Sequence, residues 1–221
     1  DYITISYPQQ DPVSLLITQQ EMFEERFEKY PPQISEYTFT NLYGWKDYYS
    51  FEWQEIDGCI VLFCRQHGKR CAYVPIGPAE RVPEVMLKVA RQENIPFVRV
   101  PEDVKNKSDT DFLGEYDPDN ADYLYNAKDL IELAGRKYDG KRNLIRKFSS
   151  EHRFEYQPLD AVCIRECLKF QESWCMEVNC GDQPGLKAED AAVKVMLENF
   201  QRFHLVGGAL RVDGVISGLA L

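Results

Sequence analysis

Residues 49–76, YSFEWQEIDGCIVLFCRQHGKRCAYVPI, carry the pattern that decides the fold of the first half of the chain. Apolar and polar side chains alternate from Tyr49 to Gln54, which is typical of a half-buried strand. Asp57-Gly58 is a hairpin turn signal, and the apolar run CIVLFC after it predicts a central strand that is buried on both faces. A further strand, CAYVPI, follows the polar segment RQHGKR. The stretch therefore predicts three consecutive antiparallel strands.

Helical patterns flank these strands on both sides along the chain. The spacing of the apolar residues and the positions of the prolines set the expected bounds, and Thr18 is expected to cap the first helix. Before the strands we expect a short strand at 15–17 and helices at 18–30 and 37–45; after them we expect a helix at 80–94, a strand at 97–100 and a helix at 102–112.

The second half of the chain repeats the beginning of this order of elements. We expect helices near 127–133 and 139–149, a strand near 153–157, two long helices separated by a loop at 181–185, and a hairpin at 206–221. This pattern predicts an α+β fold with mixed, mostly antiparallel sheets flanked by helices, in two domains, residues 1–125 and 126–221. The chain ends on an apolar strand, and such a strand edge is normally paired or protected. We therefore expect the second domain to be incomplete at its C-terminus.

The composition indicates a folded protein without a general attraction to nucleic acids or membranes. The chain has 221 residues, 44% of them hydrophobic, and a formal net charge of −10, so it can bury a core of useful size. An acidic chain disfavours unspecific binding to polyanions but leaves room for a local anion site. We expect no integral membrane segment, because no apolar run is long enough to span a bilayer and the first residues lack a signal pattern.

The seven cysteines lie singly in apolar settings such as GCIVLFC and SWCMEV, which predicts reduced thiols and a cytoplasmic protein. No C-x-x-C spacing occurs and the three histidines are scattered, so we expect no metal site. Cys175 can be interpreted as a nucleophile. No histidine has a recognisable relation to it, however, and a buried structural thiol is the simpler interpretation.

Residues 135–148, GRKYDGKRNLIRKF, concentrate positive charge in this acidic chain. The segment contains six basic side chains and one acidic side chain, Asp139. With Asp139 as N-cap, a helix here would place cations in its first turn, where the helix dipole favours anions. A bound phosphate or carboxylate would compensate this charge; the alternative is a solvated cationic face. The candidate residues for binding an anion or a charged carrier are Arg136, Lys137, Lys141, Arg142, Asn143 and Arg146.

Glu172 and Trp174 are candidates for an acceptor cleft, because they lie on a predicted helix that would face it. The alternative is a core tryptophan next to a solvated glutamate. The aromatic cluster at 37–49 can be interpreted as a base-stacking surface, but it contains few cations, so packing in a core or at a domain interface is favoured. No residue is assigned as a general base.

Three stretches resemble a known family: YPPQISEYTFTNLYGWKDYY at 30–49, DNADYLYNAKDLIELAGRKYDGKRNLIRKF at 119–148 and GGALRVDGVISGLAL at 207–221. They are similar to the family defined by the C-terminal cytoplasmic domain of phosphatidylglycerol lysyltransferases, which also has stand-alone bacterial members. The resemblance extends from about residue 14 to the end of the chain. It implies tandem acyl-CoA N-acyltransferase-like (GNAT-like) domains, related to the Fem aminoacyltransferases. In such domains the hairpin at 206–221 would precede the donor-binding phosphate loop.

The resemblance implies transfer of an acyl or aminoacyl group from an activated polyanionic carrier, aminoacyl-tRNA or acyl-CoA, to an amine or hydroxyl. The partners would be tRNA or coenzyme A as carrier, and a lipid headgroup, a peptide or a small amine as acceptor, with no tightly bound cofactor. The cations of the segment at 136–146 would then position a phosphate. Two alternatives stay open: a catalytically silent GNAT-like module that binds an anion, and a simple N-acetyltransferase that uses acetyl-CoA.

Overall fold

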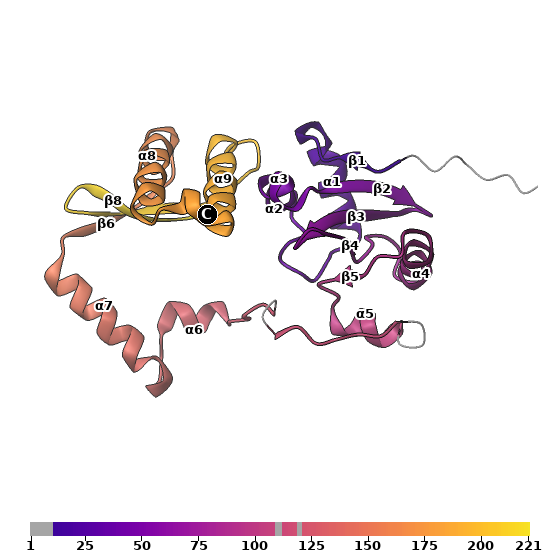
Figure 1. The fold of residues 1–221 in the computed structure, drawn as a ribbon. Helices are drawn as coiled ribbons and strands as arrows, with labels where there is room; N and C mark the ends of the chain where they lie inside the picture. Colours follow the sequence, from indigo (N-terminus) through magenta and orange to yellow (C-terminus); the bar gives the residue numbers. More distant parts are fainter. Residues whose placement is uncertain (1–10, 109–111, 119–120) are drawn as a thin grey trace, which may run out of the picture. The chain divides into compact units, whose positions relative to one another are not determined.

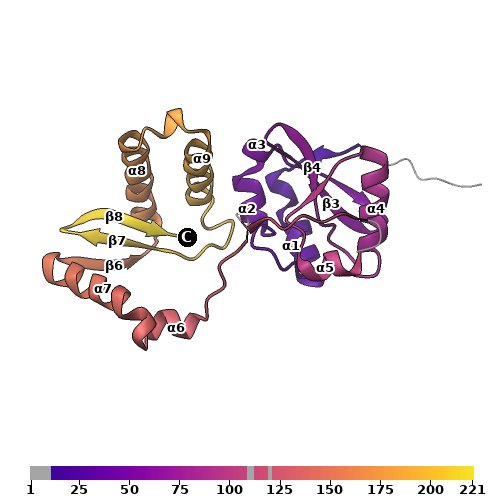
Figure 2. The same cartoon turned by 60° about the horizontal axis from the view of Figure 1, so that its bottom comes forward.

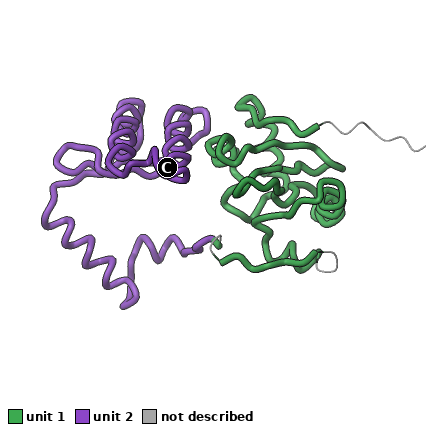
Figure 3. The backbone as a smooth tube through the Cα atoms, in the orientation of Figure 1, with its two compact units in different colours: residues 1–121 green, residues 122–221 purple. Residues whose placement is uncertain are grey.

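The computed structural model describes residues 11–108, 112–118 and 121–221. The chain forms two compact units, Asp1–Ala121 and Asp122–Leu221 (Figure 3), and each unit is considered by itself below. Both units combine helices with a mostly antiparallel sheet, so the predicted α+β class is confirmed. Among the helices of the described residues, none has both the length and the apolar character that a bilayer span requires.

Unit 1 is built on a five-stranded sheet with the order β1-β2-β3-β4-β5 (Figure 1). As predicted, the central strand β3 begins with the apolar run CIVLFC, and all six of these residues are buried. Only the last pair, β4 and β5, is parallel, because α4 crosses over between these two strands. The strands of unit 1 are β1 (Val13–Ser14), β2 (Glu52–Ile56), β3 (Cys59–Gln66), β4 (Lys69–Tyr73) and β5 (Phe97–Val98).

Helices cover both faces of this sheet, which explains why β3 is apolar on both sides. On one face, Val85 and Val89 of α4 pack against Val61 and Phe63 of β3. On the other face, the ring of Phe23 from α1 lies 5.4 Å from that of Trp53. The helices of unit 1 are α1 (Gln20–Lys29), α2 (Phe39–Gly44), α3 (Lys46–Tyr49), α4 (Val82–Glu93) and α5 (Glu102–Lys107), with the short 3-10 helix η1 (Ile17–Gln19).

The start of unit 1 differs from the prediction in its bounds. The strand lies at Val13–Ser14 and the helix begins at Gln20, so Thr18 is not the cap. The side-chain oxygen of Gln19 accepts hydrogen bonds from the backbone N of Leu16 at 2.8 Å and from Nε1 of Trp53 at 3.2 Å. These contacts hold residues 17–19 in a 3-10 turn instead of a strand, and one of the two donors comes from a distant strand.

The strand expected from Tyr49 begins later, at Glu52. Tyr49 is the last residue of α3, and Ser50 then adopts a left-handed conformation with φ +49°. The side chains of Tyr49 and Phe51 still pack together, with ring centroids 5.5 Å apart. The alternation of apolar and polar side chains thus runs across the end of α3. For this reason, the alternation alone does not show where the helix ends and the strand begins.

Unit 2 contains a three-stranded antiparallel sheet with the order β6-β7-β8. Helices α8 and α9 lie on one side of this sheet (Figure 2), where Cys163, Cys167 and Leu197 pack against Ala209 and Ile216. The strands are β6 (Phe154–Pro158), β7 (Gly208–Val212) and β8 (Val215–Ala220). The helices are α6 (Ala127–Glu132), α7 (Asp139–Glu151), α8 (Ala161–Glu177) and α9 (Pro184–Glu198), with the 3-10 helices η3 (Arg136–Tyr138) and η4 (Cys180–Asp182).

Gly208 lies close to the ring of Tyr156 where β6 and β7 pair. A Cβ atom at this position would lie 2.2 Å from the ring of Tyr156, whose atoms pass directly over the glycine. Any larger residue would have to displace this ring, which can turn towards solvent because Tyr156 is 68% exposed.

The order of elements in unit 1 is a strand, helices, three antiparallel strands, a helix and a parallel strand, and unit 2 repeats its first part. This arrangement is consistent with a GNAT-like fold. The compact units divide between Ala121 and Asp122, whereas the domain boundary expected from the sequence lay between residues 125 and 126.

Candidate functional site

The cationic segment begins in η3 and continues through α7, after a sharp turn of the chain. Helix α6 ends at Glu132, its C-cap Leu133 has φ +46°, and Gly135 has φ +85°, a conformation that suits glycine. The helix after this turn begins at Asp139, preceded by Tyr138 as N-cap. Asp139 is therefore in the first turn of the helix and is not the cap that we expected.

Arg142 holds this turn together. Its Nη1 donates to the backbone carbonyls of Leu133 and Gly135, the latter at 2.9 Å, and its Nη2 pairs with the carboxylate of Asp139. An arginine that satisfies carbonyls beyond the end of a helix stabilises that end. These contacts explain the basic side chain near the start of α7 without a bound anion. Anion binding by Arg142 stays a prediction.

Two further cations of the segment have partners within unit 2. Nζ of Lys137 lies 2.9 Å from Oδ2 of Asp129 and 4.9 Å from the ring centre of Tyr138. The hydrogen bond with Asp129 raises the pKa of Lys137 above its ordinary value. Arg146 donates to Oδ1 of Asn143 at 3.1 Å. Asn143 and Arg146 are thus brought together as neighbours on α7, and the asparagine oxygen is already used.

The side chains of Arg136, Lys141 and Lys147 are exposed, and in the part of the chain that the structure describes they have no hydrogen bond or ion pair. We call these three residues the open cations. Exposed basic side chains without intramolecular partners are available to a phosphate at low cost, because no existing ion pair has to break.

Apolar side chains accompany this charge. We call residues 126–151, which comprise α6, η3 and α7, the α6–α7 arm; it extends away from the sheet and from α8 and α9 of the same unit (Figures 1 and 2). Its inner end is fixed by Phe148, whose ring lies 5.3 Å from that of Phe154. Within unit 2 its exposed apolar side chains are Leu130, Ile131, Leu144 and Ile145. The arm can therefore offer positive charge and apolar surface to the same ligand.

Glu172 and Trp174 both lie on α8, as predicted. Glu172 is exposed and Trp174 is half-buried. Residues two positions apart on a helix do not face each other, so α8 by itself does not direct these side chains into one cleft. The acceptor role of either residue stays a prediction.

A cavity of about 330 Å³ in unit 1 was not predicted from the sequence. It lies where β4 ends and α4 begins. In parallel β-α-β crossovers, ligands bind at this end of the strands, so the crossover from β4 to β5 was the signal that could have located it. Its apolar lining includes Tyr37, Val74, Ile76, Val82 and Val104, and the exposed side chains of Lys29 and Lys107 also contribute to it.

Tyr37 forms part of the wall of this cavity and donates its hydroxyl proton to the carbonyl of Val74. Burial raises the pKa of Tyr37 well above its ordinary value, so the hydroxyl stays protonated and acts as a donor. The start of α4 is poorly suited to a phosphate: Pro83 lacks an N–H group and Glu84 places a carboxylate in the first turn. The apolar part of the cavity therefore suits an uncharged group, whereas Lys29, Asp103 and Lys107 add charged side chains to its lining.

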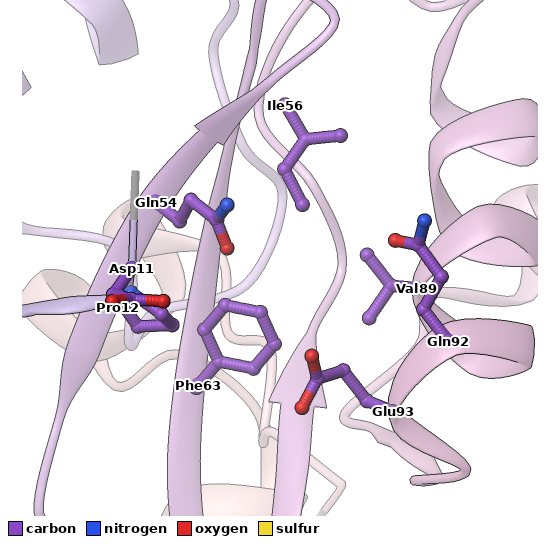
Figure 4. Close-up of a pocket in the computed structure, with 8 residues that line it drawn as sticks. All are labelled: Asp11, Pro12, Gln54, Ile56, Phe63, Val89, Gln92 and Glu93. Carbon is purple, nitrogen blue, oxygen red and sulfur yellow. The ribbon is translucent and has the colours of Figure 1, made fainter. Parts of the chain in front are cut away.

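A second, smaller cavity of about 90 Å³ lies between the sheet of unit 1 and α4 (Figure 4). Phe63 and Gln54 form one side, and Glu93 lies opposite them. Glu93 is 3.8 Å from Nε of Arg70, so its charge is already partly balanced. A space of this size holds a few water molecules and is too small for an acyl carrier.

The pairing of two cysteines contradicts the expectation that all cysteines of the chain are single thiols. Cys175 and Cys180 are joined by a disulfide, whereas the sequence suggested only single thiols. The pairing was missed because Cys175 lies in the last turn of α8 and Cys180 opens η4, and only the turn between these helices brings the two sulfurs together. The other five cysteines are free and buried.

The α+β units and the cationic arm are features that a transferase with a charged carrier can use. Residues 27–221 match the family described as phosphatidylglycerol lysyltransferase, C-terminal, and the chain belongs to this family, as the resemblance had suggested. By its name, this is a family of transferases.

The chain is also similar to a solved structure, a conserved protein of unknown function from Bacteroides thetaiotaomicron VPI-5482. The two share 26% sequence identity with a TM-score of 0.82, and the similarity covers 95% of this chain and 74% of that one. No curated protein matches the chain.

Proposed function

We propose that this protein transfers an acyl or aminoacyl group from an activated polyanionic carrier, aminoacyl-tRNA or acyl-CoA, to an amine or hydroxyl. The observation that carries the proposal is the family match over residues 27–221. The name of that family specifies lysyl transfer; for this chain, the identity of the transferred group is part of the proposal. We place the reaction in the cytoplasm, where both carriers occur.

The geometry of the arm supports a polyanionic carrier. The open cations, Arg136, Lys141 and Lys147, contact the phosphates first. Among the described residues these side chains have no hydrogen bond or ion pair that would have to break. Lys137 and Arg146 contribute by exchanging their present partners for phosphate oxygens. Arg142 supports the turn from which these side chains project.

The proposed reaction is a direct acyl transfer. The acceptor nitrogen or oxygen attacks the carbonyl carbon of the carrier ester or thioester, a C–N or C–O bond forms, and the bond to the carrier breaks. The carrier leaves as the tRNA hydroxyl or the coenzyme A thiol and takes up the proton that the acceptor loses. Such a step needs positioning and stabilisation of the oxyanion but no covalent enzyme intermediate. A lipid headgroup, a peptide and a small amine are the acceptor classes to be compared.

The test is a binding assay on the 221-residue chain with uncharged tRNA and with coenzyme A, followed by transfer assays with the charged carriers. A triple variant, Arg136→Ala, Lys141→Ala and Lys147→Ala, removes the open cations. Its matched control, Arg165→Ala, Lys169→Ala and Lys187→Ala, removes the same charge from exposed positions on α8 and α9. The salt dependence of binding is measured for both.

We expect the arm variant to bind the carrier more weakly, while the control binds as the wild type does. For tRNA, the salt slope should fall by about one unit for each phosphate that the variant no longer neutralises. Equal effects of the two variants, or no binding of either carrier by the wild type, would refute the proposal. Binding of tRNA without transfer would indicate the silent module, and transfer from acetyl-CoA with indifference to tRNA would indicate a simple N-acetyltransferase.

A further inference from the structure

Two cysteines and an aspartate meet at the turn between α8 and α9, away from the cationic segment along the chain. Cys175 lies in the last turn of α8, Cys180 opens η4 and Asp190 lies in α9. The Cα atoms of the two cysteines are 5.0 Å apart. Both sulfurs and a carboxylate oxygen of Asp190 lie within 4.8 Å of one another. Among the residues that the structure describes, no other three such side chains bring their ligand atoms this close.

Asp190 is the part of this cluster that points to a ligand. The residue is only 8% exposed, and its Oδ1 is buried without a hydrogen-bond partner. Its other oxygen, Oδ2, accepts a hydrogen bond from Nζ of Lys194 at 2.9 Å. A buried carboxylate oxygen without a partner is costly, so this oxygen calls for a cation or a donor that the surrounding protein atoms do not supply.

We propose that Cys175, Cys180 and Asp190 bind one Zn²⁺ when the two cysteines are reduced. Thiolate sulfur and carboxylate oxygen are ordinary zinc ligands, and three protein ligands leave one position for water. Two sulfurs on a tetrahedral zinc lie about 3.8 Å apart, given a Zn–S distance of about 2.3 Å. Zinc and the disulfide therefore exclude each other, and the oxidation state of the cysteines decides whether the metal can bind.

The charges at the site support this assignment. Two thiolates and one carboxylate carry three negative charges, which Zn²⁺ and the ammonium of Lys194 together neutralise. Lys194 also holds Oδ2, so it orients the carboxylate as outer groups commonly do for metal ligands. Binding to the reduced protein releases the two thiol protons. The half-buried position of Cys175 leaves a path for the ion, whereas Cys180 is buried.

Other cysteines of the chain lack this environment. The sulfurs of Cys64 and Cys71 lie 2.7 Å apart across β3 and β4, and Cys163 and Cys167 are neighbours on α8. Neither pair has a carboxylate or histidine nitrogen completing a set of three ligands among the described residues. These cysteines therefore supply controls within the same chain.

The experiment uses the full chain, reduced with a phosphine and desalted without oxygen, and then titrated with Zn²⁺ against a chromophoric chelator. Metal per chain is measured by mass spectrometry for the reduced and the oxidised protein. Co²⁺ serves as a second probe, since thiolate ligation produces a charge-transfer absorption that a carboxylate-only site does not show. The variants are Cys175→Ser, Cys180→Ser and Asp190→Asn, with Cys167→Ala as control.

We expect one equivalent of Zn²⁺ in the reduced wild type and in the control, and none in the oxidised protein. Each cysteine variant loses the cobalt charge-transfer band of a two-thiolate site, and Asp190→Asn weakens zinc binding by at least about 10-fold, the lower bound typical of a change in the outer groups alone. If Cys180→Ser fails to fold, the half-buried Cys175→Ser decides. Absence of zinc from the reduced wild type, or full zinc content in Cys175→Ser, overturns the proposal.

Discussion

Replacing Arg142 tests whether this residue stabilises the turn of the α6–α7 arm or binds an anion. The variant Arg142→Gln removes donation to the carbonyls of Leu133 and Gly135 and the ion pair with Asp139. The Arg142 side chain is 31% exposed, so each hydrogen bond from the guanidinium contributes less than the buried value, about 0.5–1 kcal/mol. The exposed ion pair adds about 0.2–1 kcal/mol. Together these contacts stabilise the turn by about 1–3 kcal/mol.

Hydrogen exchange measured by mass spectrometry reports this loss locally, because the arm can open without unfolding the rest of unit 2. A loss of about 1–3 kcal/mol accelerates exchange of amides in residues 133–142 by about 5- to 150-fold. The control is Arg146→Gln, which loses only its hydrogen bond to Asn143 and should leave this exchange near the wild-type rate. Unchanged exchange in Arg142→Gln, combined with weaker binding of tRNA or coenzyme A, would refute the structural role and restore the anion-binding interpretation.

Two further predictions concern packing and pH. Gly208→Ala should lower the free energy of unfolding by only about 0.5–1 kcal/mol in urea, because the new methyl group meets the outer end of the exposed Tyr156 ring, which can turn away; Tyr156→Ser should remove most of this cost in the double variant, and additive effects would contradict the collision. Burial raises the pKa of Tyr37 and of Tyr73, so the folded protein favours the neutral form of both phenols. The stability that comes from burying them is fully present below their pKa in the unfolded chain, about 10. It is lost as the pH rises through their higher pKa values in the folded protein. In an absorbance titration both should ionise only as the protein unfolds at alkaline pH, with one fewer late-ionising group in Tyr37→Phe, and ionisation near pH 10 in the folded protein would count against their burial.

The hairpin strands of unit 1 were predictable because their signals are local. Asp57-Gly58 marks the β2–β3 turn, and the run from Cys59 to Cys64 is apolar because helices cover both faces of β3. The helices α8 and α9 were equally predictable from the spacing of their apolar residues, since burial on one face of a helix repeats every three to four residues. The bounds of the helices and strands were harder to predict. The 3-10 turn at residues 17–19, for example, depends on a hydrogen bond from Trp53 to Gln19, and Trp53 is distant in sequence.

The cationic segment shows what the sequence could not predict about the candidate site. The sequence shows six basic residues in 135–148 but not which of them have partners. Arg142 reaches back to Leu133, and Lys137 reaches back to Asp129, because the chain turns at Leu133 and Gly135, which have positive φ angles. The open cations were distinguishable only once this turn was known.

The sequence by itself determined the α+β class, the antiparallel core of unit 1, the absence of a long apolar run and the concentration of charge near residue 140, because these features depend on the order and periodicity of side chains. Only the tertiary structure decided which cations stay open, that Cys175, Cys180 and Asp190 come together, and that a cavity forms where β4 ends and α4 begins. Each of these depends on contacts between residues separated by turns, and the direction in which a turn sends the chain is set by packing and by hydrogen bonds that no local pattern records.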